Sequence, residues 1–368
     1  MRVKGSKKNQ GIALLMTLSI ILFVSVALMK TFESRSVEMA HLGNTFQRFQ
    51  AETLSRSALR TILMTIIKSR KLSVVMNEKD RWQGIPFPIE NGIFQINEIK
   101  SIDHYFNFNA FRYFDPNSEN SVDRIAAETF RNMVNQYTEN QKDIIEIFES
   151  DINAAMSGIN DWTDIDQDSD QAFGNDFEQY PQQGSYFEVK NRDFDRISEL
   201  KMIPSFQKLG LPYDYLKDNF RVIGLDEPSI DINLATVSEL ESFLERYEGI
   251  DEYKTINERR SQLVEIIETV DKELKDNIQS NPFGESVRFP PPLYGENSVW
   301  KRELDRRDIS LGGNDVLFSA DSEYLRIEFS VKVDRITINA ESIVKLVYPK
   351  QGKDLNISQI SIIEYTLL

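Results

Sequence analysis

The chain has no cysteine among its 368 residues, which excludes disulfide bonds and thiolate chemistry. Histidine is almost absent as well, since only His41 and His104 occur. Lone histidines rarely define a site, so we expect His41 to be an exposed helix residue and His104 to pack beside aromatic side chains. The sequence contains no phosphate-binding loop, no His-Glu-x-x-His and no Gly-x-Ser-x-Gly. We therefore predict that the protein is not an enzyme.

Positive charge is in the minority, because 43 Lys and Arg stand against 58 Asp and Glu, for a net charge of -15. Such a chain repels phosphate groups, so we expect no nucleic acid partner. Residues 238–260 have the spacing of a DNA-binding helix-hairpin-helix, with Gly249 at the hairpin position. The usual second glycine is missing, and glutamates surround the hairpin. We interpret this segment as a packing module that presents a protein-binding surface.

Proline is absent from the first 80 residues, and an uncharged apolar run from Ile12 to Met29 lies there. As a helix rising about 1.5 Å per residue, the run spans roughly 27 Å, close to the hydrocarbon core of a bilayer. The basic leader before it should stay in the cytoplasm, and everything after Lys30 should be exported. We expect a single-pass inner-membrane protein with its C-terminal domain in the periplasm. The basic residues of the leader are Arg2, Lys4, Lys7 and Lys8.

The apolar periodicity continues beyond the membrane, because apolar residues recur at three- and four-residue steps from Ala51 to Ile67. The pattern predicts one helix over about 12–71, with its first half in lipid and its second half packed on a globular domain. Two helices broken near Gly43-Asn44 are the alternative.

The remaining segments alternate between helical and strand-like patterns. A short strand is predicted over 92–99, a turn over 105–111 and helix over 121–156 with a polar break at 138–140. A helical face over 194–203 is expected to close at Pro204. Thr236 and Glu239 have capping-box spacing, which predicts a helix from Val237 onward to about Ile278. Prolines at 282 and 290–292 indicate a linker or loop.

The C-terminal segment is predicted to be β. Residues 325–333 alternate between apolar and polar, Asp334-Arg335 forms a tight reversal, and strand-like sequence continues at 336–348 and 360–367. We predict an α+β fold: a long N-terminal helix packed on an antiparallel sheet, with a large inserted helical region.

An acidic segment, residues 160–178, carries many carboxylates and no Lys or Arg. Asp164, Asp166, Asp168 and Asp170 alternate in the manner of loops that bind hard cations such as calcium. An EF-hand is excluded, because Ser169 and Asn175 occupy its glycine and glutamate positions. A solvated acidic loop is the alternative, although Trp162 and Phe173 favour a segment anchored to a core.

Three interpretations of the leader are open. A cleaved signal peptide is disfavoured, because residues 26–30 make a poor cleavage site. The others are an uncleaved anchor and a cut between Gly11 and Ile12, which would leave the apolar helix as the new N-terminus. The last arrangement resembles type IV pilins and type II secretion pseudopilins. Most of these carry Glu at the fifth mature position, where this chain has Met16; in that respect it is similar to the K-type minor pseudopilin.

Further segments resemble the K-type family in the same order along the chain. They are 106–109, an Asn-x-Asn turn; 161–164, an Asp-Trp-Ile-Asp-like motif; 174–180, the loosely matching end of the acidic stretch; 194–200, a short helix; and 232–236, the entry to a second module. The resemblance implies a pilin-like long N-terminal helix packed on an antiparallel sheet, with a large inserted helical region of two SAM-like modules. It also implies calcium binding by the acidic segment. The ligands it favours are Asp164, Asp166, Asp168, Asp176 and Glu178.

The resemblance implies a structural role: a subunit at the tip of the pseudopilus that caps it, begins its assembly and so serves protein export. It implies I- and J-type minor pseudopilins and the inner-membrane secretion platform as partners, with prepilin peptidase as the processing enzyme. A membrane-tethered calcium-dependent binding protein that forms no fibre is the alternative. A type IV pilus minor pilin is disfavoured by Met16 and by the two helical modules.

The expected division of the chain follows from these elements. It is a basic leader (1–11), a transmembrane helical part (12–30), the helix continuation and first strands of the pseudopilin domain (31–105), a first inserted helical module (106–224) with its acidic loop (160–180), a second inserted module (225–300), and the C-terminal strands (301–368).

Overall fold

The structure is a computed structural model of the chain. It describes residues 7–69, 83–89, 92–113, 121–140, 147–163, 190, 192–224, 228–232, 235–280, 299–311, 317–319, 322–347 and 359–368.

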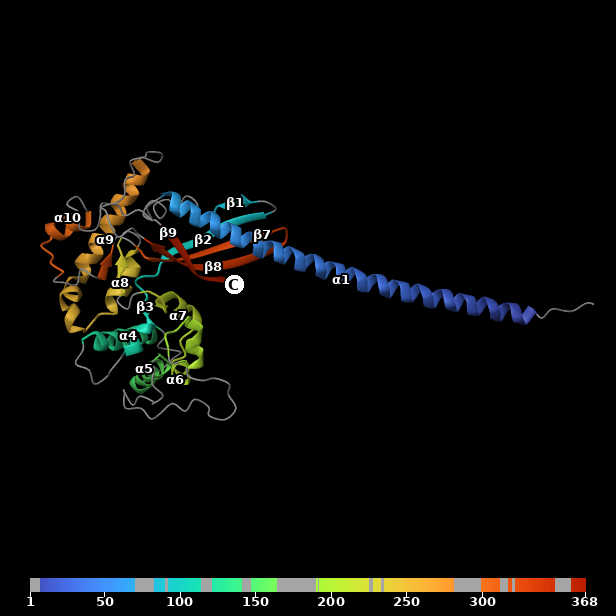
Figure 1. Cartoon of the computed structure of the whole chain (residues 1–368), viewed down its shortest axis with the longest axis horizontal. Helices are drawn as coiled ribbons and strands as arrows, with labels where there is room; N and C mark the ends of the chain where they lie inside the picture. Colours follow the sequence, from blue (N-terminus) through green and yellow to red (C-terminus); the bar gives the residue numbers. More distant parts are fainter. Residues whose placement is uncertain are drawn as a thin grey trace, which may run out of the picture.

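Helix α1 runs unbroken over Lys7–Ser69, a length of 63 residues or roughly 95 Å. The predicted long helix is therefore confirmed, and the alternative of a break near Gly43-Asn44 is wrong. A Cβ added to Gly43 would meet nothing within 4 Å, because the helix there stands away from the rest of the chain. Figure 1 shows the N-terminal part of α1 projecting far beyond the globular part.

The C-terminal half of α1 covers one face of a five-stranded antiparallel sheet with the order β1-β2-β7-β8-β9. The strands are β1 (Pro86–Ile89), β2 (Gly92–Ser101), β7 (Tyr324–Val333), β8 (Ile336–Val347) and β9 (Gln359–Leu367). The tight reversal predicted at Asp334-Arg335 joins β7 to β8, with Asp334 in the left-handed region at φ 50°. The alternation of the C-terminal sequence thus folds as predicted.

The first hydrophobic core lies between α1 and this sheet. The periodic stripe predicted from Ala51 to Ile67 faces the sheet, and alternate residues of β7 such as Ile327, Phe329 and Val331 are fully buried beneath it. The α+β prediction is confirmed: a long helix packs its apolar stripe on an antiparallel sheet.

The helical middle of the chain is an insertion between β2 and β7. These two strands pair antiparallel, and Ser101 lies opposite Leu325, so the insertion leaves and re-enters the sheet at the same end. It contains two further cores of buried residues, defined here as the first and second lobes. Figure 1 places both lobes toward the end of the sheet that is distant from Lys7.

The first lobe is built around phenylalanines. Phe108 and Phe220 stack with centroids 4.6 Å apart, and Phe106, Phe111, Phe130 and Phe206 surround them. Its elements are β3 (Phe106–Asn107), η1 (Phe108–Tyr113), α4 (Ser121–Asn140), α5 (Glu149–Thr163), η2 (Ile197–Met202), α6 (Pro204–Lys208), α7 (Tyr213–Asn219) and β4 (Phe220–Arg221). The turn predicted near 105–111 is confirmed. The helix predicted over 121–156 is divided as expected, but α4 includes the residues 138–140 at which the break was predicted, and α5 begins at Glu149.

The helical face predicted to close at Pro204 does end there, since η2 stops at Met202, and Pro204 then opens α6, where its missing N–H has no partner to lose in a first helical turn. One prediction for the first lobe is wrong. The acidic loop does not begin at Asn160, because α5 continues to Thr163 and buries Asn160, Asp161, Trp162 and Thr163.

The second lobe contains β5 (Ile230–Asp231), α8 (Val237–Glu245), η3 (Asp251–Tyr253), α9 (Lys254–Ser280), α10 (Val299–Arg306) and β6 (Phe318–Ser319). The capping box is confirmed: Thr236 Oγ1 accepts from Glu239 N at 3.2 Å, and Thr236 N donates to the Glu239 carboxylate at 2.8 Å. The helix predicted to run on to Ile278 is interrupted after Glu245, where Gly249 adopts φ 78°.

The second core also reaches beyond residue 300. Trp300, Leu304 and Phe318 pack into it, so α10 and β6 belong to the inserted region and not to the C-terminal strands predicted over 301–368.

Phe108 tests the first core. Replacing this fully buried ring by alanine removes its contacts with Phe220 and leaves a cavity, so we expect Phe108→Ala to lower the free energy of unfolding of this lobe by about 3–5 kcal/mol. Urea unfolding of the full chain followed by tryptophan fluorescence measures it. Phe148→Ala is the matched control, since Phe148 is 58% exposed and should change little.

Candidate functional site

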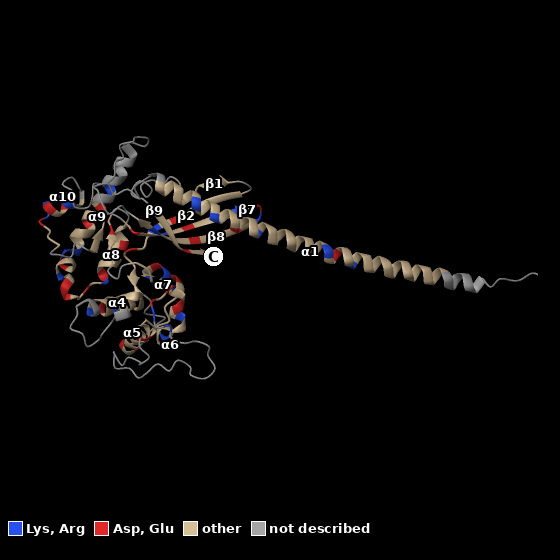
Figure 2. Cartoon of the chain, viewed as in Figure 1, with Lys and Arg blue, Asp and Glu red and all other residues tan. Residues whose placement is uncertain are grey.

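The projecting part of α1 is the largest exposed apolar surface among the described residues. Its large apolar side chains from Leu14 to Met29 are all exposed, and no charge occurs between Leu14 and Lys30 (Figure 2). By length and composition, α1 is the one described helix that is apolar enough to cross a membrane. It is consistent with a single-pass anchor.

A second apolar surface lies on α1 beyond the lipid-spanning length. Five large apolar residues are between 61% and 72% exposed and recur at steps of seven, three, four and three. This is the spacing of a coiled-coil seam. We name them the outer stripe: Phe32, Met39, Leu42, Phe46 and Phe49.

The outer stripe and the sheet-facing residues lie on opposite sides of α1, given about 100° of rotation per residue. Ala58 and Ile62 are buried under the sheet, whereas Phe46 and Phe49 point away from it. The face from Ala51 to Ile67 is covered by the chain's own sheet, as the sequence predicted for this half of the helix. The outer stripe is the free helical surface among the described residues.

The predicted processing residues lie near the start of the same helix. Gly11 and Ile12 are helical in α1, five and six residues into it, and Met16 follows in the exposed apolar segment.

The predicted calcium ligands Asp164, Asp166, Asp168, Asp176 and Glu178 lie outside the described residues. The structure does describe the residues just before them. Trp162 is buried at the end of α5 and stacks on Phe194 with centroids 6.4 Å apart. Trp162 is thus buried in the first core, whereas Phe173 and the rest of the acidic segment lie outside the described residues. Among the described residues, no group of three or more His, Asp or Glu is placed to hold a metal ion.

A set of buried charges joins the lobes to the sheet. Asp103 lies just after β2, and its carboxylate accepts from the backbone N–H of Glu323 at 2.6 Å and of Tyr324 at 3.0 Å. Arg221 of the first lobe lies 3.7 Å away. Burial raises the pKa of Asp103 to about 6, and the positive charge of Arg221 opposes this only in part. Asp103 thus ties the exit of β2, the start of β7 and the first lobe together.

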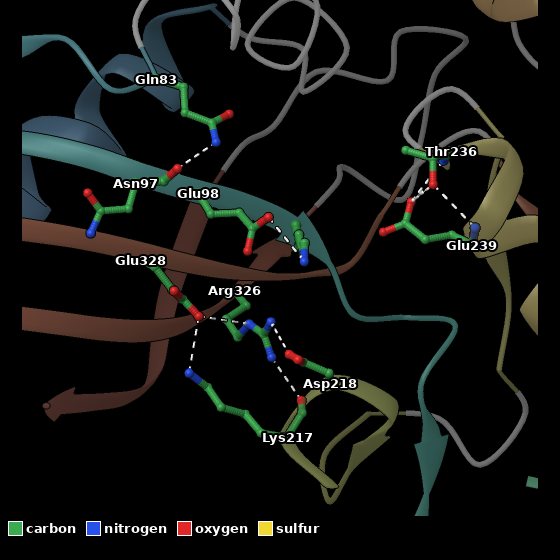
Figure 3. Close-up of polar contacts among 10 residues, drawn as sticks. Gln83, Asn97, Glu98, Lys217, Asp218, Thr236, Glu239, Arg326 and Glu328 are labelled. Carbon is green, nitrogen blue, oxygen red and sulfur yellow. Dashed lines mark hydrogen bonds and ion pairs between the residues drawn. The ribbon is translucent and has the colours of Figure 1, made fainter. Parts of the chain in front are cut away.

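Arg326 on β7 makes the second tie (Figure 3). Its guanidinium donates to the Asp218 carboxylate at 2.7 Å and to the Lys217 carbonyl at 2.8 Å. Lys217 in turn lies 3.1 Å from Glu328 of β7 and pairs with Glu341 of β8. These bonds fix α7 against the polar face of the sheet, opposite to α1.

The second lobe is held to the first lobe and to the sheet by similar bonds. Asn132 Nδ2 on α4 donates to the carbonyls of Arg246 and Glu248, both at 2.9 Å. The buried guanidinium of Arg246 donates to the His104 carbonyl at 2.8 Å. His104 is buried against Tyr105 and Phe243, which confirms its packing role, and burial lowers its pKa well below the usual value. The two lobes and the sheet therefore form one connected body.

Sequence reasoning missed this junction because its members lie far apart in the chain. Arg326 occupies a polar position of an alternating strand, which reads as a solvent-facing residue, and only the inserted lobe makes it buried. Asp103 follows the strand predicted over 92–99 and carries no motif. A charged residue next to the predicted entry of a long insertion was the one available signal.

The sequence of the chain has little similarity to those of known proteins. No protein-family model and no curated protein matches the chain. Among solved structures the chain is similar to a chain of the crystal structure of the GspK-GspI-GspJ complex from the type 2 secretion system of enterotoxigenic Escherichia coli. The TM-score is 0.49 with 14% sequence identity, and the match covers 88% of this chain and 98% of that chain.

The raised pKa of Asp103 predicts a pH dependence of stability. The folded chain holds this proton up to about pH 6, whereas the unfolded chain releases it near the ordinary value of 3.8. The free energy of unfolding due to this group should therefore be greatest below about pH 4 and be lost as the pH rises through about 6, by at most about 3 kcal/mol.

Asp103→Asn removes the titration. The pH-dependent difference in urea midpoint between the original chain and this variant measures the effect between pH 4 and 7. Glu248→Gln, at a mostly exposed carboxylate, serves as the control. Parallel pH profiles for the original chain and Asp103→Asn would contradict the assignment.

Proposed function

We propose that this chain is a minor pseudopilin of the K type, positioned at the tip of a type II secretion pseudopilus. Its helix first holds the subunit in the inner membrane and then packs against other subunits. The observation that carries this proposal is the outer stripe: a seam of apolar residues on a helix that continues without a break from the lipid-spanning segment.

Because α1 is continuous, a cut near its start would leave one helix that joins the apolar segment to the domain. A cut between Gly11 and Ile12 would remove Arg2, Lys4, Lys7 and Lys8, the charges that hold the leader in the cytoplasm. What remains would begin with an uncharged apolar helix that can leave the bilayer sideways into a helical bundle. A rigid rod of this kind carries its membrane end into an assembly together with its globular end.

The outer stripe suits helix-to-helix packing in that bundle. A surface of Phe, Met and Leu at alternating three- and four-residue steps is stable only when a second helix covers it, since apolar area exposed to water is unfavourable. A tethered receptor that works alone has no need of such a seam between membrane and domain.

Position 16 and the inserted lobes favour a tip subunit. A carboxylate inside a fibre needs a cationic partner, and Met16 removes that need for a subunit that assembles first. Both lobes lie at the end of the molecule distant from the membrane segment (Figure 1), where they would block another subunit from stacking above. The proposed partners are I- and J-type minor pseudopilins, the secretion platform and prepilin peptidase.

We include calcium binding in this proposal. The acidic segment is rich in carboxylate oxygens, which hard cations prefer. Asp164, Asp166, Asp168, Asp176 and Glu178 would hold the ion, and the burial of Trp162 and its stacking on Phe194 support an ordered start for the segment. When bound, calcium would neutralise carboxylates that otherwise repel one another.

Processing is the main test. Co-production with a prepilin peptidase should shorten the membrane-extracted chain by the mass of residues 1–11, and intact-mass spectrometry should place the new N-terminus at Ile12. Gly11→Val should stay uncut, whereas Gly43→Val, a matched change at an open position in the same helix, should be cut normally. Mature protein of unchanged mass in the presence of the peptidase refutes the proposal.

Assembly through the outer stripe is tested by single cysteines, which the cysteine-free chain allows directly. A photoreactive cysteine label at Phe46→Cys should cross-link to the helix of another subunit in native membranes. Val37→Cys is the control, because Val37 is equally exposed but lies on the other side of α1. Equal adducts at the two positions, or none at Phe46, favour the tethered binding protein that forms no fibre.

Calcium is tested by chelation. Removing an ion that binds only the folded state should lower the melting temperature, and at a free ion concentration 100 times the dissociation constant the loss is about 2.7 kcal/mol. Differential scanning calorimetry with EDTA, and then with calcium restored, measures the shift. The double variant Asp164→Ala with Asp166→Ala should melt at the lower temperature and ignore EDTA; an unchanged melting temperature in both experiments leaves a solvated acidic loop.

A further inference from the structure

The outer stripe has one polar position inside its seam. Its residues recur at steps of seven, three, four and three, so the seam position between Phe32 and Met39 falls on Arg35. At about 100° of rotation per residue, Arg35 lies within about 60° of every residue of the outer stripe and close to its centre. The surface that we propose for packing against another helix therefore contains a permanent positive charge.

Arg35 has no ion-pair partner within the described part of the chain. It is exposed, and no carboxylate of the described residues lies within ion-pair distance of its guanidinium. Glu38 follows one turn later, but it lies about 60° to the side of Arg35 and does not pair with it. Arg48 on the same helix differs, because it pairs with Glu52 at 3.2 Å.

The rest of the outer side of α1 has the same sign of charge. The outer side continues past the outer stripe through Arg60 and Met64, which are both exposed. Between residues 32 and 67, no Asp or Glu lies within about 60° of the centre of the outer stripe, whereas Arg35 and Arg60 do. Arg56, at the margin, lies 5.9 Å from the centroid of the Tyr365 ring. A positive surface on a chain of net charge -15 favours an acidic partner.

Covering the outer stripe removes water from Arg35. Its neighbours along the seam are Phe32, Met39 and Leu42, none of which can accept a hydrogen bond from a guanidinium through its side chain. A charge that loses its water without gaining a partner is costly. A helix that packs on this seam therefore has to bring an Asp or Glu to the level of Arg35.

A second copy of the chain fits this requirement poorly. Two copies anchored in one membrane run parallel, and in register they would place Arg35 opposite Arg35. A shift of three residues would bring Glu38 of one copy beside Arg35 of the other, but the same shift places Phe49 opposite Glu52. The seam would then lose an apolar pair, and the second Arg35 would still face no carboxylate.

We propose that Arg35 selects the partner of the outer stripe, which is a parallel helix of a different membrane-anchored chain with an Asp or Glu opposite Arg35 in an otherwise apolar seam. Arg35 follows Lys30 by five residues, or about 7.5 Å, so this ion pair lies just outside the hydrocarbon core. The proposal rests on the helix-to-helix assembly of the proposed function and adds the chemistry by which the partner is recognised.

The test uses the full chain carrying Phe46→Cys with its photoreactive label, in membranes of cells that naturally produce the protein. We expect an adduct with a different protein, whose cross-linked helix has an Asp or Glu about three turns before the attachment point. Arg35→Glu should lower the adduct yield at least about tenfold, because it places two carboxylates together in the seam. Arg48→Glu is the matched control on another side of α1 and should leave the yield unchanged.

A charge swap separates recognition from a general effect on the helix. Replacing the partner's Asp or Glu by Arg should lower the yield with the original chain and restore it with Arg35→Glu. A loss that this swap does not restore makes a lipid phosphate the ligand of Arg35 and overturns the proposal. A yield that Arg35→Glu leaves unchanged, a partner helix without an acidic residue at that level, or an adduct of twice the mass of the chain overturns it too.

The failure of this inference is distinguishable from that of the proposed function. A chain that is cut at Gly11 and cross-links through Phe46, with a yield that ignores Arg35→Glu, refutes the role of Arg35 alone. The absence of every adduct at Phe46 refutes helix-to-helix assembly itself.

Discussion

The rest of the structure depends on the contact between the second half of α1 and the sheet. Ala58, Ile62 and Ile66 are buried against β7 and β8, and that burial fixes the direction in which the rest of the helix leaves the domain. With about 25 cal/mol gained per Å² of apolar surface removed from water, a stripe of this length is a strong attachment. The exposed seam beyond it owes its position to this contact.

The insertion depends on the same sheet in a different way. Because β2 and β7 are neighbours, the two lobes leave and return at one end, and short polar ties suffice to orient them. Asp103, Arg246 and Arg326 make those ties from buried positions, where a charge without a partner would be costly. Apolar contacts thus attach α1 to the sheet, whereas polar bonds orient the two lobes relative to the sheet.

Features that depend on local sequence periodicity were predictable, and contacts between residues far apart in the chain were not. The long helix, the C-terminal hairpin and the Thr236–Glu239 box depend on residues within a few positions of one another, and all three were predicted. The helical stop before Pro204 was predicted, whereas α6, which the same residue begins, was not. Arg326 could not be recognised, since its burial depends on a lobe whose residues lie about a hundred positions away.

The candidate site follows the same division. The apolar segment that contains Met16 and the packing of the Ala51–Ile67 face on the domain were predicted from the sequence, whereas the outer stripe on the opposite side of the same helix was not. The sequence pattern shows where a helix is apolar. It does not show which apolar side chains stay exposed in the folded chain.

The link between α1 and β9 has a mechanical meaning. Ser55 Oγ lies 2.5 Å from the Tyr365 hydroxyl, and Arg56 lies 5.9 Å from the centroid of its ring, so Tyr365 joins α1 to the edge strand beside their shared apolar core. Because the hydrogen bonds of an antiparallel sheet run across its strands, a pull along the strands on the projecting end of α1 would act on many of these bonds at once. The projecting part of α1 could therefore bear a load without separating from the sheet.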